Sequence, residues 1–151
     1  INDIFNGQGI TEAIKTKNND DGITKLLEVM AKDFTGLSFT NLVDFDSEYG
    51  HRRNPEGYRD ALEHLDRRLP ELMDSLREDD LLIITADHGT DPTHQGTDHT
   101  REYVPLLAIS PAFEEAGEIK QGYFADTSQT ISENFNVEST ENGTSYLDQL
   151  L

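Results

Sequence analysis

The sequence predicts an α/β fold with a mostly parallel sheet flanked by helices. Short apolar runs at 38–45, 80–86 and 103–109 are typical of strands that are covered on both faces. Between the first two runs, residues 56–78 repeat apolar side chains every three or four positions, as an amphipathic helix does. Strand, helix and strand in this order form the crossover unit of a parallel sheet. We therefore expect strand 38–45 to lie parallel to strand 80–86.

The first part of the chain is expected to contain one helix. Residues 22–34 carry apolar side chains at helical spacing, with Asp21 as the expected N-cap and Gly36 as the stop signal. The more polar residues before them predict only a short extended piece at 2–5 and one helical turn near 11–16.

Two further helices are expected. The helix at 56–78 has a strong start signal, because Asn54 can cap it and Pro55 suits its first position. Pro70 should kink this helix or split it in two. A final helix is predicted at 126–135, followed by a polar tail.

The composition excludes several classes of function. The 151 residues carry 12 basic and 30 acidic side chains, giving a net charge of −18. A protein of this charge does not offer the basic face that nucleic acids or anionic membranes require. No apolar run approaches the ~20 residues of a membrane helix. The absence of cysteine excludes thiol chemistry and agrees with a cytoplasmic location.

Candidate metal ligands follow two of the expected strands. Asp46 and, five residues later, His51 follow the first strand. Asp87 and His88 end the second, and His99 lies in the loop after it. Aspartate and histidine are common oxygen and nitrogen ligands of divalent metals. Because parallel strands end at the same edge of a sheet, these five side chains are expected to meet there.

Other polar residues near these positions have simpler interpretations. Asp44 is closer to the strand than Asp46 and could be confused with it, whereas Asp98 more simply shapes the loop beside His99. Arg52 and Arg101 could meet phosphate or form surface ion pairs, and Arg53 is expected in a surface salt bridge. Two remaining histidines are expected to be solvent-exposed, His64 and His94.

The five ligands together resemble the metal-binding set of the alkaline phosphatase superfamily. Within it, the strings DFDSEYGHR at 44–52, TADHG at 85–89 and GTDHTRE at 96–102 resemble those of the phosphopentomutases, as does NDIFNGQGI at 2–10. The resemblance implies an alkaline phosphatase-like core and two Mn²⁺ ions, with Zn²⁺ or Mg²⁺ as alternatives. It assigns ligands to the two ions as follows: Asp46, His51 and His99 to one, and Asp87 and His88 to the other.

The resemblance also implies a reaction. An intact phosphopentomutase interconverts (deoxy)ribose 1-phosphate and (deoxy)ribose 5-phosphate through a phosphothreonine, so a small pentose phosphate is the expected partner. The family's threonine nucleophile and one further metal-binding aspartate have no counterpart in this chain. Residues 1–151 are therefore expected to be the C-terminal part of the metal-binding core, without the N-terminal core segment and the cap domain. This fragment is expected to contain no catalytic nucleophile and to be inactive alone.

Two alternatives remain open at the level of sequence. The same ligand types occur in other members of the superfamily, such as a cofactor-independent phosphoglycerate mutase, a phosphatase or a sulfatase. A non-catalytic acidic module that binds a cation for stability is the alternative from a different class of function.

Overall fold

The computed structural model describes residues 2–120 and 122–150 and divides the chain into two compact units. The first unit runs to Leu76 and includes His88–Tyr103, whereas the second contains Arg77–Asp87 and the chain from Val104 onward. The first unit holds helix α1 (Asn19–Met30), a π-helix η1 (Phe45–Gly50) and helix α2 (Pro55–Asp74). The second holds strands β1 (Leu82–Thr85) and β2 (Leu106–Ile109), helix α3 (Phe124–Asn134) and a 3-10 helix η2 (Leu147–Gln149).

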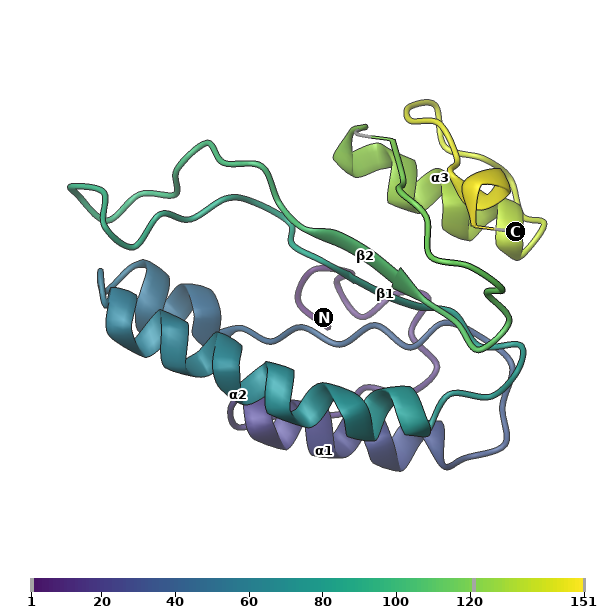
Figure 1. Cartoon of the computed structure of the whole chain (residues 1–151), viewed down its shortest axis with the longest axis horizontal. Helices are drawn as coiled ribbons and strands as arrows, with labels where there is room; N and C mark the ends of the chain where they lie inside the picture. The colour runs from purple at the N-terminus through teal and green to yellow at the C-terminus, as the bar shows by residue number, and fades with distance from the viewer. Residues whose placement is uncertain (1, 121, 151) are drawn as a thin grey trace. The chain divides into compact units, whose positions relative to one another are not determined.

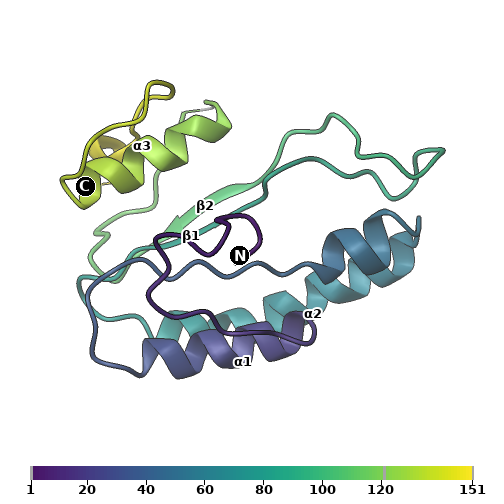
Figure 2. The ribbon, with the colours of Figure 1, turned by 180° about the vertical axis from the view of Figure 1, so that it is seen from behind.

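Helices α1 and α2 lie side by side in the first unit, as Figures 1 and 2 show from opposite sides. Asp20 of α1 bonds two residues of α2: its carboxylate lies 2.8 Å from His64 Nε2 and also pairs with Arg68. The hydrogen bond from His64, followed by the contact with Arg68, lowers the pKa of Asp20. Among the described residues of this unit, Ile23 of α1 and Leu72 of α2 are the buried apolar side chains, at 2% and 4% exposure. Polar links therefore supplement a small apolar core.

The boundaries of α1 differ from the prediction at both ends. The side chain of Asn18, not that of Asp21, caps the helix by accepting a hydrogen bond of 2.9 Å from the Asp21 amide. The helix ends at Met30, well before Gly36. Upstream, residues 2–5 form turns and residues 11–16 are not helical, so the extended piece and the helical turn expected there are both wrong.

Helix α2 begins as predicted. Asn54 Oδ1 accepts from the Gly57 amide at 3.0 Å, and Pro55 is the first helical residue. The helix ends at Asp74, before the predicted boundary, and it continues unbroken through Pro70. A proline removes its own amide from the helical ladder, and its ring crowds the carbonyl four residues earlier. Neither effect interrupts this helix.

The predicted strand at 38–45 is not observed. No strand lies in this region of the described chain, and β1 therefore has no parallel neighbour there. Leu37, Phe39 and Val43 are each about half exposed, at 58%, 54% and 48%. β-Branched and apolar residues favour an extended backbone, but a strand also needs a hydrogen-bonding partner. The expected mostly parallel sheet is thus wrong for the described residues.

The second unit contains the only sheet in residues 2–120 and 122–150, and its two strands are antiparallel. Leu82 lies opposite Ile109, and Thr85 lies opposite Leu106. Both strands fall within runs that the sequence predicted, and Pro105 directly precedes β2, where its missing amide breaks no ladder bond. Local strand propensity thus located both strands, but the sequence did not predict that they pair antiparallel.

The tail of the chain packs on α3 in the second unit. Asp126 accepts hydrogen bonds of 2.8 Å from the amides of Tyr123, just before the helix, and of Thr144 in the tail. Thr130, only 1% exposed, accepts a bond of 3.0 Å from the amide of Tyr146. The predicted helix and its start are thus confirmed within two residues, and Tyr146 anchors the tail with 3% exposure.

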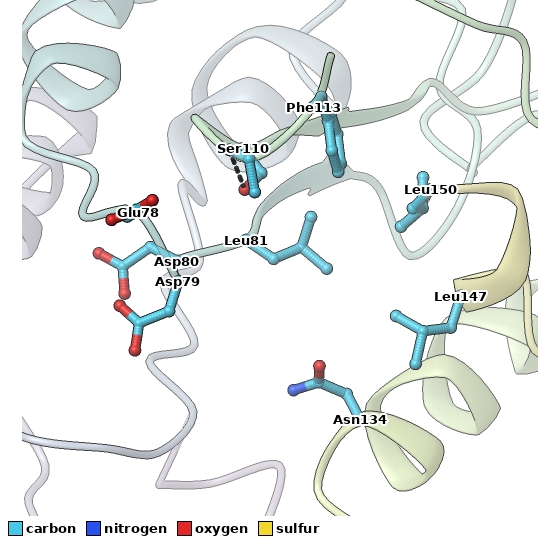
Figure 3. A pocket seen from close by; sticks show the side chains of 10 residues that line it. Glu78, Asp79, Asp80, Leu81, Ser110, Phe113, Asn134, Leu147 and Leu150 are labelled. Carbon is cyan, nitrogen blue, oxygen red and sulfur yellow. Dashed lines mark hydrogen bonds between the residues drawn. The ribbon is translucent and has the colours of Figure 1, made fainter. Parts of the chain in front are cut away.

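A cavity of about 170 Å³ lies within the second unit. Figure 3 shows Leu81, Leu147 and Leu150 around it, with the carboxylates of Asp79 and Asp80 gathered at one side. No histidine lines this cavity. Across the part of the chain that the structure describes, no helix has both the length and the apolar character needed to cross a membrane.

Candidate metal centre

Asp46 and His51 are brought together by the π-helix η1. The His51 amide donates to the Asp46 carbonyl at 2.8 Å, a hydrogen bond that spans five residues. A π-helical turn closes after this number of residues and is frequent at functional sites. The five-residue step in the sequence therefore places one side chain directly after the other, and His51 Nε2 lies 3.3 Å from Asp46 Oδ2.

His88 and His99 come from the two limbs of the loop at 88–103. An isolated antiparallel bridge between Gly89 and Thr100 holds these limbs together next to the two histidines. A side chain at position 89 would have no space, because a Cβ there would lie 2.5 Å from the backbone nitrogen of Glu102. Glycine at this position allows the close approach.

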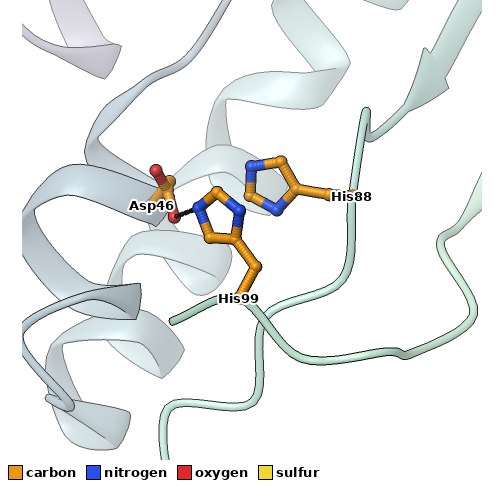
Figure 4. A group of neighbouring side chains, drawn as sticks. All are labelled: Asp46, His88 and His99. Atoms are coloured by element: carbon orange, nitrogen blue, oxygen red, sulfur yellow. Dashed lines mark ion pairs between the residues drawn. The ribbon is translucent and has the colours of Figure 1, made fainter. Parts of the chain in front are cut away.

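Three donor atoms, one each from Asp46, His88 and His99, lie within 4.8 Å of one another (Figure 4). His99 Nε2 is 3.3 Å from Asp46 Oδ1, and the rings of His88 and His99 stack with their centroids 3.6 Å apart. His51 adds a fourth donor, since its Nε2 lies 3.1 Å from that of His99. Ligands at about 2.0–2.2 Å from one ion lie about 3.0–3.6 Å apart, so the spacings among the donors of Asp46, His51 and His99 suit a shared cation.

The tautomer of His51 also favours a cation. Its Nδ1 lies within hydrogen-bond distance of the Thr97 carbonyl oxygen, which can only accept, so this nitrogen carries the hydrogen. Nε2, the other ring nitrogen, faces the Asp46 carboxylate and His99. A hydrogen bond at the other ring nitrogen is the usual support of a metal-binding histidine.

One carboxylate oxygen of Asp46 lacks a hydrogen bond. Its Oδ1 atom is buried and accepts no hydrogen bond from the described residues, despite the His99 nitrogen 3.3 Å away. Gly50, in the same π-helix, leaves room beside it, because a Cβ there would lie 2.6 Å from Thr90 Cγ2 and 3.4 Å from Asp46 Oδ1. A buried carboxylate oxygen without a partner is costly, and a bound cation would satisfy it. The donor set therefore fits a divalent metal.

Two aromatic side chains, Phe45 and Tyr58, lie near the Asp46 carboxylate. The ring of Tyr58 contacts that of Phe45 with a centroid distance of 5.5 Å. Burial, together with the negative charge of Asp46, raises the pKa of the Tyr58 hydroxyl. The hydroxyl therefore stays neutral and adds no charge to the donor cluster.

Asp44 and Asp46 have different roles although only two positions separate them. Asp44 Oδ2 accepts from the Asn19 amide at 2.8 Å, and the Asp44 amide donates to Asn19 Oδ1 at 3.0 Å. This reciprocal pair joins Asp44 to the start of α1. Asp44 is thus engaged in holding the fold, whereas Asp46 faces the histidines.

The remaining candidates are not brought into the group of three donors. Asp87 is the last residue of its segment in the second unit, and its predicted role as a ligand stays a prediction. His94 is exposed, and so is Arg101. Arg52 is exposed and pairs with Glu48 at 2.8 Å.

His88, which the resemblance assigns to a second ion, lies beside the donors assigned to the first. The two ions of a two-metal site lie about 3.5–4 Å apart, which is close enough for this arrangement.

Arg53 is the residue whose role the sequence missed. Its guanidinium donates to the carbonyl oxygens of Asp91, Gly96 and Asp98, all in the loop that carries His99. The expected surface salt bridge is therefore wrong, because the partners are backbone carbonyls rather than a carboxylate. No local pattern signals such contacts, which depend on residues about forty positions away.

Residues 2–139 match the family model of the Metalloenzyme superfamily. The matched span includes the π-helix, the loop and every predicted ligand. The chain belongs to the Metalloenzyme superfamily. Membership in this superfamily, together with the Asp46–His88–His99 group, supports a metal-dependent function.

Proposed function

We propose that this member of the Metalloenzyme superfamily serves as the metal-binding part of a phosphopentomutase, which interconverts (deoxy)ribose 1-phosphate and (deoxy)ribose 5-phosphate. The observation that carries the proposal is the mixed cluster of one carboxylate and three imidazoles on the π-helix and the loop. The strings at 44–52 and 96–102, which resemble phosphopentomutases, supply the choice of reaction.

The donor atoms favour particular metals. Asp46, His51 and His99 would hold one cation, and Asp87 with His88 would contribute to a second. Imidazole nitrogen suits Mn²⁺ or Zn²⁺ better than Mg²⁺, which prefers oxygen ligands. When bound, two such cations neutralise charge on a phosphoryl group and stabilise the attacking and leaving oxygens of its transfer.

The donor cluster is accessible to a phosphate group in solution. The side chains of His51 and His99 are 42% and 44% exposed, so a phosphate group in solution can reach the cluster. The net charge of −18 opposes the approach of an anionic sugar phosphate. Positive charge at the cluster is therefore a requirement for this substrate class, which gives the metal a role in binding as well as in transfer.

The proposal requires two groups that have no counterpart in this chain, a nucleophilic threonine and a further aspartate ligand. By resemblance they belong to an N-terminal segment of the same core. We place this polypeptide as the C-terminal part of that core. The activity is accordingly assigned to a longer polypeptide that contains it.

The decisive experiment measures phosphate transfer in the longest natural polypeptide that contains this chain. With Mn²⁺ present, ribose 1-phosphate should convert to ribose 5-phosphate with no net release of inorganic phosphate. ³¹P NMR monitors both phosphate esters and free phosphate. Release of phosphate without movement between C1 and C5 would instead identify a phosphatase. Activity on 3-phosphoglycerate or a sulfate ester, with none on the pentose phosphate, would assign another member of the superfamily.

Removing the metal with a chelator distinguishes an enzyme from a module in which the cation only stabilises the fold. If the cations serve only stability, their removal should unfold the chain. A chain that keeps its helical circular dichroism without metal, and regains binding when Mn²⁺ is restored, agrees with a functional site.

A further inference from the structure

We propose that Arg53 is a positioning residue of the metal centre, which holds the loop at 91–98 so that His99 and His51 meet Asp46. The proposal rests on the proposed metal-dependent function, because it concerns the same donors. Arg53 itself is not a metal ligand, since a guanidinium has no lone pair to offer.

The contacts of Arg53 span the whole loop. Nη1 donates to the Asp91 carbonyl at 2.8 Å, Nε to the Gly96 carbonyl at 2.5 Å, and Nη2 to the Asp98 carbonyl at 2.5 Å. A planar fork of donors can meet several carbonyls at once, whereas a lysine ammonium acts as a compact point charge. One side chain therefore fixes both ends of the loop.

The fixed carbonyls flank the atoms that orient the metal-binding histidines. Between Gly96 and Asp98, the Thr97 carbonyl accepts from His51 Nδ1. His99 directly follows Asp98. If the loop moved, the Thr97 carbonyl would leave His51, and His99 would leave the 3.3 Å distance that it keeps to Asp46. Arg53 thus acts on two donors without touching either.

The backbone of Arg53 supports the same conclusion. Its φ of 50° lies in the left-handed region, which costs about 1 kcal/mol or more for a residue with a side chain. Glycine would occupy this position without that cost. The guanidinium contacts give a reason for an arginine here, and the turn is completed by a 3.0 Å bond from its amide to the Gly50 carbonyl.

The test compares wild type with Arg53→Gly, which relieves the backbone, and Arg53→Lys, which keeps the charge. Arg52→Ala is the matched control, because Arg52 is the adjacent arginine and pairs only with Glu48 in the contacts described. Co²⁺ is titrated by calorimetry and by its visible absorption spectrum. Loss of a group that orients metal ligands typically weakens metal binding roughly 10–100-fold. We expect this loss and an altered spectrum in Arg53→Gly, only partial recovery in Arg53→Lys, and wild-type behaviour in Arg52→Ala.

Hydrogen exchange of the loop amides in the metal-free chain provides the independent readout. Arg53→Gly should exchange faster across 91–98, while helices α1 and α2 keep wild-type protection. Unchanged exchange in the loop, or Co²⁺ affinity and spectrum equal to wild type, would overturn the proposal. If wild type itself binds no Co²⁺, the proposed metal function fails, and the exchange comparison still decides whether Arg53 holds the loop.

Discussion

The Nε2 atoms of His51 and His99 lie 3.1 Å apart, and each is 3.3 Å from an oxygen of the same carboxylate, that of Asp46. Because the Thr97 carbonyl accepts from His51 Nδ1, the facing nitrogen of His51 is the one that can bind a metal. Two imidazoles and a carboxylate converging at such distances are the arrangement that a cation site requires, and this geometry leads to the first prediction.

Replacing His99 with alanine should reduce the affinity for Mn²⁺ or Co²⁺ at least tenfold, because it removes one of the converging donors. Calorimetric titration measures the change. His94→Ala is the matched control, since His94 lies in the same loop but is exposed and outside the donor group. Equal weakening by the two variants would show that metal binds elsewhere on this acidic chain.

The π-helix should tolerate no side chain at Gly50. A Cβ there would lie 2.6 Å from Thr90 Cγ2 and 3.1 Å from the Phe45 carbonyl oxygen. We expect Gly50→Ala to lower the free energy of unfolding by about 1–3 kcal/mol, the usual cost of overpacking, and to weaken metal binding as well. Urea unfolding measures the former and calorimetry the latter.

The cause of this effect can be separated from a general loss of stability. Adding Thr90→Ser removes the methyl group that the new Cβ would meet and should restore part of the loss, as a double-mutant cycle reports. Gly117→Ala is the control, since a Cβ at Gly117 has nothing within 4 Å. Failure of the serine to restore anything would place the strain at the Phe45 carbonyl instead.

The sequence predicted the elements that depend on local signals. Asn54 and Pro55 define the start of α2 because capping and proline geometry act within a few residues. The apolar run at 38–45 carried an equally clear signal but forms no strand, since pairing depends on a partner elsewhere in the chain. The direction of pairing between β1 and β2 likewise has no local signature.

The site likewise combines features that local sequence predicts with features that depend on distant residues. The five-residue step from Asp46 to His51 is local, because it corresponds to one turn of the π-helix. The competing Asp44 is distinguished only by its reciprocal bonds with Asn19, which are 25 positions away. Arg53 could not be singled out at all, because its partners are carbonyl oxygens that every residue carries.

The contact between Asp20 and α2 predicts a dependence of stability on pH. The pKa of Asp20 is lowered in the folded chain, first by the hydrogen bond from His64 and then by Arg68. The unfolded chain therefore binds the proton more readily, so this contribution is fully present above the ordinary value of 3.8 and is lost as pH falls through the lowered pKa.

Asp20→Asn tests this directly in urea unfolding at a series of pH values. The advantage of wild type over the variant should be present above pH 3.8 and should disappear in acid below it. Because Asp20 is exposed, high salt should reduce the advantage at neutral pH. A difference that is the same at all pH values would mean that the carboxylate charge does not join the helices.

The last prediction concerns the tail on α3. Thr130 is buried, and its hydroxyl both donates to the Asp126 carbonyl at 2.8 Å and accepts from the Tyr146 amide at 3.0 Å. Thr130→Val keeps the shape but leaves that amide without an acceptor, which typically costs about 1–3 kcal/mol. Thermal unfolding should show this loss, and hydrogen exchange should show it concentrated at 144–149. Thr130→Ser, which keeps the hydroxyl and loses a methyl group, should retain the slow exchange of the Tyr146 amide. Faster exchange of that amide in serine than in valine would show that methyl packing, not the hydroxyl, anchors the tail.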